Sequence, residues 1–283
     1  MLYLVLAVLS SALVAIVMRA GTAGGESRKP MLLVNYAVCA GVSLFFLRGR
    51  PAGQGFGVAL GLGLIGGALY LTAFLLFQYN VRTGGVTLSS AFMKLGVIVP
   101  TLLGISLFGE SAGPARLAGI ALTVLAILMM ARHGEASSAN GRAGQNAANL
   151  PALILLLICG GMADGLSKFY AAWGNPALEG YFLCFVFCFA LVLCAVVCAI
   201  QKQLPTRRDF VFGLLLGIPN YSSSRFLLSS LSSVPASVAY PLFSCGAILL
   251  SAVLGRLCFG ERISRRQAVS LIPVLFALVL LNL

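Results

Sequence analysis

Three charged residues stand inside long apolar stretches of the sequence and are the first candidates for chemistry: Lys94, Asp164 and Arg225. An unpaired charge in apolar surroundings is energetically expensive, so such residues usually face a polar cavity and act there. Lysine and arginine bind carboxylate or phosphate groups, and the guanidinium fork of arginine can do so through two hydrogen bonds. Asp164 could receive an ammonium group or take up and release a proton as a coupling group. A structural ion pair with Lys168, one helical turn later, is the alternative for Asp164.

Polar residues gather around Arg225. Asn220 and Ser224 are four positions apart, as are Tyr221 and Arg225, so a helix places them on two neighbouring stripes. Pro219 is expected to interrupt the helix just before these stripes. The pattern predicts the wall of a solvated binding site, with close helix packing through small hydroxyl residues as the alternative.

Lys94 lies about half way along another apolar stretch, and Pro100, six residues later, is expected to loosen a helical turn beside it. A lysine that extends to the membrane surface is the alternative, but the distance to the end of the stretch is long. Further candidate lining residues are aromatic or amide side chains, for which packing is the alternative. They are Asn35, Tyr36, Tyr70 and Phe92.

Motifs of enzymes and metal proteins are missing from the sequence. Its eight cysteines form no CxxC pair, and it contains a single histidine, His133. We find no GxxxxGK[ST], HExxH or GxSxG pattern. The sequence therefore predicts no catalytic residue, no metal ligand and no cofactor, and the chain is not expected to be an enzyme.

The elements that must position these residues are membrane-spanning helices. Of the 283 residues, 60% are hydrophobic and 9% are charged, which is too few charges to cover a water-soluble surface. A helix that crosses the hydrocarbon layer needs roughly 20 apolar residues. We predict ten such spans, at residues 2–18, 31–47, 56–79, 84–107, 114–132, 150–171, 179–200, 210–230, 235–258 and 266–282. This composition excludes a soluble enzyme and a nucleic-acid-binding protein.

The sequence repeats itself at a shift of 151 residues. The shift aligns Phe108-Gly109-Glu110 with Phe259-Gly260-Glu261. We predict a first five-helix repeat at residues 1–132, a linker at 133–149 and a second repeat at 150–283. An odd number of helices per repeat inverts the second copy in the membrane. Lys and Arg concentrate in the loops after odd-numbered spans, which places both termini outside a prokaryotic inner membrane.

The segments 91–110 and 239–262 resemble the fourth and ninth helices of the drug/metabolite transporter (DMT) superfamily, in its ten-helix EamA-type branch. The stretch from Ala239 to Ser244 also resembles the pocket helix of the small multidrug resistance branch. That resemblance implies pocket roles for Tyr240 and Phe243, and we include Ser244 among the candidate substrate-binding residues.

The sequence also departs from that branch. There, a membrane-embedded glutamate lies two turns before a basic residue at the end of the first helix. The corresponding positions here, counted back from Arg19 and Lys168, are Ser11 and Gly160, and neither can bind a proton. Antiport of cationic drugs by that route is therefore not expected. For Arg19, Lys168 and the two glutamates of the repeat, Glu110 and Glu261, we expect structural roles at helix ends and hairpins.

The predicted function is secondary transport by alternating access around a central cavity, with a small polar, anionic or zwitterionic metabolite, similar to an amino acid, as substrate. Two cations and one anion in the bundle favour such a substrate over a lipophilic cation. The alternative is a translocase for a phosphate-bearing, lipid-linked carrier, and a membrane scaffold is a third class. The expected partners are the lipid bilayer and a small-molecule substrate, without nucleic acid, and the expected state is a monomer or a homodimer.

Overall fold

The computed structural model describes residues 1–22, 28–47, 55–108, 113–115, 117–122, 125, 143–231, 233–234, 236–260, 269, 272–273, 275–276 and 279–280. Throughout these residues the regular secondary structure is helical, without a strand. Six of the described helices are long and apolar enough to cross a membrane. The prediction of an all-helical membrane protein is confirmed at this level.

The helices lie where eight of the ten predicted spans were placed. Their bounds are α1 Leu2–Gly21, α2 Lys29–Phe46, α3 Phe56–Gly84, α4 Val86–Leu95, α5 Ile98–Phe108, α7 Ala143–Trp173, the short 3-10 helix η2 Pro176–Leu178, α8 Glu179–Ile200, α9 Arg207–Ser230 and α10 Ala236–Phe259. The predicted spans at 114–132 and 266–282 fall mostly outside the described residues. Helix α7 begins inside the predicted linker, because the alanine-rich segment that precedes the span continues the helix.

The predicted fourth span is two helices, α4 and α5, separated at Gly96 and Val97. Pro100 explains the position of the break. A proline has no N–H to donate to the carbonyl four residues before it, and its ring clashes with that carbonyl. The carbonyl in question belongs to Gly96, which instead accepts a hydrogen bond from the N–H of Val99, at 2.9 Å.

Helix α9, by contrast, runs without interruption through Pro219, so the expected break before Asn220 is wrong. This helix packs along its length against α1 on one side and α2 on the other. We attribute its continuity to that packing, which holds the backbone in helical geometry despite the missing hydrogen bond.

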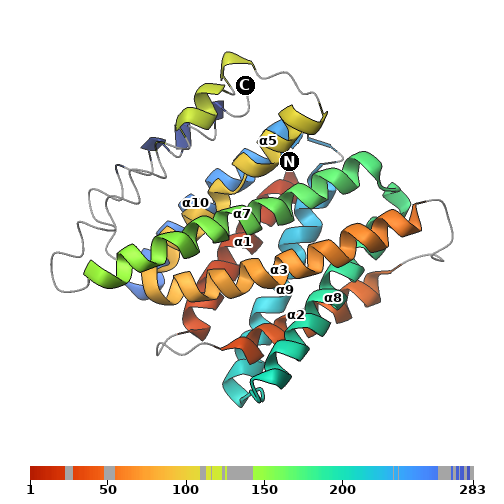
Figure 1. The fold of residues 1–283 in the computed structure, drawn as a ribbon, viewed down its shortest axis with the longest axis vertical. Helices are drawn as coiled ribbons and strands as arrows, with labels where there is room; N and C mark the ends of the chain where they lie inside the picture. Colours follow the sequence, from red (N-terminus) through yellow and green to blue (C-terminus); the bar gives the residue numbers. More distant parts are fainter. Residues whose placement is uncertain are drawn as a thin grey trace.

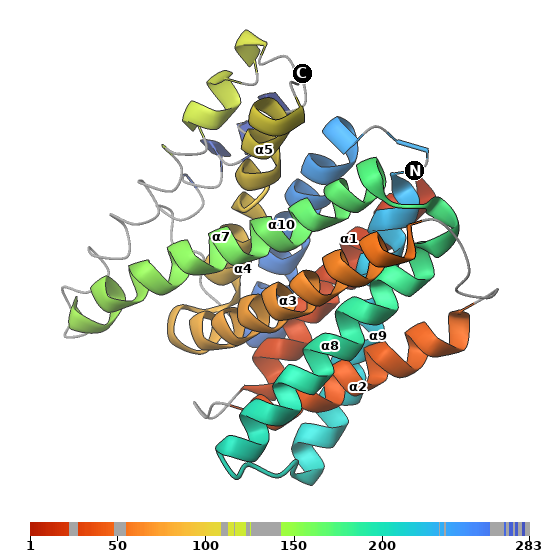
Figure 2. The ribbon, with the colours of Figure 1, turned by 45° about the vertical axis from the view of Figure 1, so that its right-hand side comes forward.

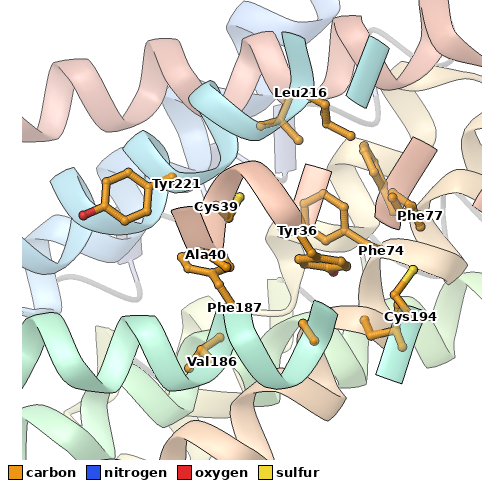
Figure 3. Close-up of a cluster of buried hydrophobic side chains, with 14 of the residues drawn as sticks. Tyr36, Cys39, Ala40, Phe74, Phe77, Val186, Phe187, Cys194, Leu216 and Tyr221 are labelled. Atoms are coloured by element: carbon orange, nitrogen blue, oxygen red, sulfur yellow. The ribbon is translucent and has the colours of Figure 1, made fainter. Parts of the chain in front are cut away.

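Eight of the described helices pack side by side in a closed ring, in the order α2, α8, α3, α7, α4, α10, α1, α9 and back to α2. Figures 1 and 2 show α2 and α8 at one side of the molecule and α4, α5 and α7 at the other. Two apolar clusters fill the bundle. One lies mainly among α1, α2, α3, α8 and α9, and the other among α1, α4, α7 and α10. Figure 3 shows the first cluster, in which the rings of Tyr36 and Phe74 are 6.0 Å apart between centroids.

Glycines bring α3 and α9 unusually close to their neighbours. A Cβ atom at Gly67 of α3 would lie 2.7 Å from the carbonyl oxygen of Val186 in α8. A Cβ atom at Gly217 of α9 would lie 2.6 Å from Cβ of Val38 in α2. No side chain fits at such distances, so both helix pairs depend on glycine for close contact.

One end of the bundle is basic and closely tied. The guanidinium of Arg28, which precedes α2, lies 3.3 Å from the carboxylate of Asp209 in the first turn of α9. Lys29 donates to the side chain of Gln201, after α8, at 2.6 Å. At the same end Arg19 of α1 donates to the carbonyl of Val81 in α3, at 3.2 Å. These contacts show that α1, α3 and α8 run toward this end and that α2 and α9 run away from it.

Asp209 anchors the basic end electrostatically. It is buried, at 3% exposure, and forms a reciprocal capping box with Thr206 at the start of α9. Burial alone would raise the pKa of Asp209, but the hydrogen bonds from Thr206 and the neighbouring charge of Arg28 outweigh it. The pKa of this carboxyl is therefore lower than its ordinary value.

Candidate functional site

A cavity lies inside the ring, between α1, α3, α4, α7, α9 and α10. About 70 Å³ of it is open to the centres of water molecules. One water needs roughly 10 to 15 Å³ by this measure, so the cavity has room for on the order of five waters. Its polar lining residues are Ser11, Tyr70, Ser90, Lys94, Asp164, Ser167, Asn220, Ser223, Ser224 and Ser251.

Lys94 brings a positive charge to this cavity from the last turn of α4. Its side chain is 9% exposed, and Nζ lies 3.9 Å from the centre of the Phe243 ring of α10. An ammonium over an aromatic face is attracted by the electrons of the ring. The break after α4 keeps Lys94 near the middle of the bundle, at the end of a helix whose last carbonyls favour a cation.

Asp164 brings the opposite charge from α7. It lines the same cavity as Lys94, and the two charges interact electrostatically. Its charge also acts on the hydroxyl of Tyr70 in α3. A cavity with a cation on one wall and an anion on another can orient a dipolar solute.

Hydrogen bonds hold the polar wall supplied by α9. The hydroxyls of Tyr70 and Ser224 are 3.3 Å apart, and the Ser224 hydroxyl also donates to the carbonyl of Asn220. Asn220 donates from Nδ2 to Oδ1 of Asn35, at 3.2 Å. Asn35 itself is fully buried in α2 and is not among the residues that line the cavity. It orients Asn220 from behind, while Tyr70 and Asn220 line the cavity. Their contact with a substrate stays a prediction.

Arg225 and Tyr221 do not line the cavity. The guanidinium of Arg225 lies 2.8 Å from the carboxylate of Glu179 at the start of α8, and 41% of the arginine side chain is exposed. The ring of Tyr221 packs between Phe187 and Phe46, with centroids 6.0 Å and 6.4 Å away. The structure therefore separates Arg225 from Lys94, and a shared contact with one small substrate stays a prediction.

The remaining predicted site residues occupy several places. Phe92 is fully buried in the second apolar cluster, and Ser244 is buried without lining the cavity. Phe243 lines the cavity and contacts Lys94, and its role toward a substrate stays a prediction. Lys168 is half-buried in α7 and also lies outside the lining.

Other predictions cannot be placed. Glu110 and Glu261 lie outside the described residues, and the side chain of Tyr240 is not described. Their hairpin and pocket roles remain predictions. Arg19 is at a helix end, where a structural role was expected, and its hydrogen bond to Val81 joins α1 to α3.

The sequence reasoning missed most of the serines around the cavity. Ser90 precedes Lys94 by four residues, and Ser167 follows Asp164 by three, so both share a helix face with a charge that had been singled out. Ser251 faces the cavity from α10. The spacing from each charged residue was the available signal for the first two.

No family model matches this chain. The sequence is similar to that of an uncharacterized protein of Haemophilus influenzae, with 22% identity over 287 residues that cover 97% of this chain and 95% of the relative. The structure is similar to a solved crystal structure, with a TM-score of 0.64 and 16% sequence identity. That similarity covers 99% of this chain and 94% of the other. The fold and the site define an all-helical membrane protein with a charged central cavity, and its fold is shared along nearly its whole length with a known structure.

Proposed function

We propose that the chain is a secondary-active membrane transporter that moves a small polar, anionic or zwitterionic metabolite, similar to an amino acid, by alternating access. The observation that carries the proposal is the central cavity with Lys94 on one wall and Asp164 on another. Charges inside a membrane bundle are expensive, and a transporter uses them to replace the water around its substrate. A purely structural bundle would gain more stability from apolar side chains at both positions.

The order of helices in the ring supports two inverted repeats. Exchanging α1 with α7, α2 with α8, α3 with α9 and α4 with α10 reproduces every neighbouring pair of the ring. Under this exchange the contact of α3 with α8 becomes that of α9 with α2, and both depend on glycine. Helix α2 runs opposite to α8, with which it exchanges, and α3 runs opposite to α9. We propose on these grounds the architecture of ten helices in two inverted halves, of the EamA type in the DMT superfamily.

The two halves contribute differently to the site. Lys94 belongs to the first half and Asp164 to the second, so their separation depends on how the halves are docked. Rocking of one half against the other would change the space between the two charges while each stays fixed in its own half. A substrate that bridges them would thereby be sensed by both halves.

The ends of the cavity suit a path that opens alternately. Toward the basic end the neighbouring side chains of Phe77, Val81 and Val86 are almost fully buried. The hydrogen bond from Arg19 to the carbonyl of Val81 joins α1 to α3 at this end. Toward the opposite end, α8 and α9 are joined by the pair of Glu179 and Arg225. We assign closure of the two ends to these contacts.

Transport into proteoliposomes tests the proposal. Wild-type protein would be screened for uptake and exchange of small amino acids and carboxylates, and the variants Lys94→Met and Asp164→Asn would be compared with it. We expect both variants to insert and purify normally and to lose transport. Lys202→Met, which removes an exposed lysine outside the cavity, is the matched control and should transport normally. Transport at the wild-type rate by both cavity variants would contradict the proposal and favour a membrane scaffold.

The lipid-linked carrier translocase needs its cations to act together on one phosphate. Arg225 is instead paired with Glu179, away from the cavity of Lys94. The charge beside Lys94 in the cavity is that of an acid, Asp164, which can pair with the ammonium group of a zwitterion, whereas a phosphate has no such group. These contacts favour the small metabolite.

A further inference from the structure

The buried hydroxyl of Ser90 has no hydrogen-bond partner among the described residues. The residue is 5% exposed, it lines the central cavity, and its Oγ meets no donor or acceptor in the described part of the chain. Its neighbour Ser89 is also buried, but the Ser89 hydroxyl donates to the carbonyl of Gly85 at 2.7 Å. Ser251, which lines the same cavity from α10, donates to the carbonyl of Ala247 at 2.6 Å. Buried hydroxyls are nearly always paired, so an unpaired one in a residue that lines a cavity is a candidate to bind a ligand or water there.

Ser90 lies one helical turn before Lys94, and both line the same cavity from α4. Residues four apart on a helix are neighbours on one face. The ammonium of Lys94 rests on the Phe243 ring, which occupies one side of it. A carboxylate has two oxygens and can accept from the hydroxyl with one and from the ammonium with the other.

We propose that Ser90 and Lys94 form a carboxylate subsite, so that the substrate binds in one orientation with its cationic group toward Asp164. This inference rests on the proposed function and specifies its substrate as a carboxylate-bearing, amino-acid-like zwitterion. The size of the cavity sets a limit as well. Room for about five waters, at roughly 30 Å³ each, corresponds to a solute of about 150 Å³. Ser90 is then the residue that selects for a carboxylate, because its hydroxyl is left unpaired when that group is missing.

Three related probes separate the two ends of the site. Alanine carries both charged groups, propionate carries only the carboxylate, and alaninamide carries only the ammonium. Their binding to purified protein in lipid nanodiscs would be measured by titration calorimetry, for wild type and for Ser90→Ala. The control is Ser89→Ala, which removes a hydroxyl from the same helix outside the cavity. Ser90→Cys is a second variant, because a thiol is a much weaker donor in nearly the same space.

A hydrogen bond to a charged group contributes enough for about a tenfold or larger change in affinity. We expect Ser90→Ala and Ser90→Cys to lower the affinity for alanine and for propionate by that factor and to leave the affinity for alaninamide unchanged. Ser89→Ala should bind all three probes as wild type does. Equal affinities of the Ser90 and Ser89 variants for alanine would overturn the subsite, and so would wild-type protein that binds neither alanine nor propionate.

The two proposals can fail separately. If alanine is transported and the Ser90 variants bind it normally, the carboxylate subsite is wrong and the transporter stands. If alanine and propionate bind through Ser90 but no substrate crosses the proteoliposome membrane, the subsite is right and the transporter is wrong.

Discussion

The clearest energetic test replaces the two cavity charges together. Lys94 is 9% exposed and has left most of its water, a loss that costs several kcal/mol for an ammonium. The contact with the Phe243 ring, at 3.9 Å, contributes about 2 kcal/mol where water is excluded. The attraction to Asp164 offsets part of the remaining cost of desolvation. Replacement of a buried charge pair by neutral groups of similar volume is neutral to stabilising by about 1–4 kcal/mol. We therefore expect Lys94→Met combined with Asp164→Asn to match or exceed the wild type in stability.

The single variants should behave differently. Lys94→Met removes a cation that acts on the Asp164 carboxylate, and Asp164→Asn removes the anion that acts on the Lys94 ammonium. Each single variant should therefore be less stable than the double variant, so that the two changes are non-additive. Thermal unfolding of the four proteins in one detergent, without ligand, measures the free energy of coupling.

The refuting result is additive destabilisation. If the double variant unfolds at a temperature lowered by the sum of the two single effects, the charges stabilise the fold and need no function to explain them. The expected pattern, a stable double variant that has lost ligand binding, would show that both charges are retained for the substrate. Ligand-induced stabilisation, present in wild type and absent from the double variant, is the accompanying measurement.

Three further predictions concern the frame around the site. Gly217→Ala should lower stability by about 1–3 kcal/mol because no space exists for its Cβ, whereas Gly61→Ala, with nothing within 4 Å, should not, as measured by thermal unfolding. Arg225→Ala and Glu179→Gln should change the transport rate to the same extent while ligand affinity stays near wild type, since the pair lies outside the cavity; a large loss of affinity would place Arg225 in the site. At pH values above its unfolded-state pKa, Asp209 should stabilise the basic end, and this contribution should be lost as the pH falls through the lower pKa of the native state. The stability of an Asp209→Asn variant should therefore depend less on pH in the acid range, as measured by thermal unfolding.

The positions of the helices could be predicted from apolar length alone. The predicted span at residues 179–200 coincides with α8, and that at 31–47 differs from α2 by one or two residues at each end. A membrane-spanning segment must be long and apolar, and both properties can be read from the segment itself without knowledge of its neighbours. The effects of proline were less predictable. Pro100 breaks its span and Pro219 does not, because the outcome depends on which helices support the backbone.

The contacts of the site depended on tertiary structure that the sequence does not reveal. Arg225 stood out as an isolated arginine in a polar stretch, but its partner Glu179 is 46 residues away in the chain, at the start of another helix. Ser90 had no signal beyond its distance from Lys94, since serine is common in membrane helices. Whether a hydroxyl bonds its own backbone, as that of Ser89 does, or stays unpaired is decided by side-chain geometry.

The proposed duplication explains the arrangement of the helices better than it explains the charged residues of the cavity. The shift of 151 residues, which aligns Gly66 of α3 with Gly217 of α9, pairs Lys94 with Cys245, and the shift of 149 near the start of each half pairs Asp164 with Ala15. Neither charge is therefore repeated. A symmetric cavity would carry two like charges, and these would repel each other in a medium of low dielectric constant. One cation and one anion, each supplied by a different half, avoid that repulsion and give the cavity a direction. In the proposed transporter, the symmetric elements would close the two ends in turn, and the substrate would be recognised where the two halves differ.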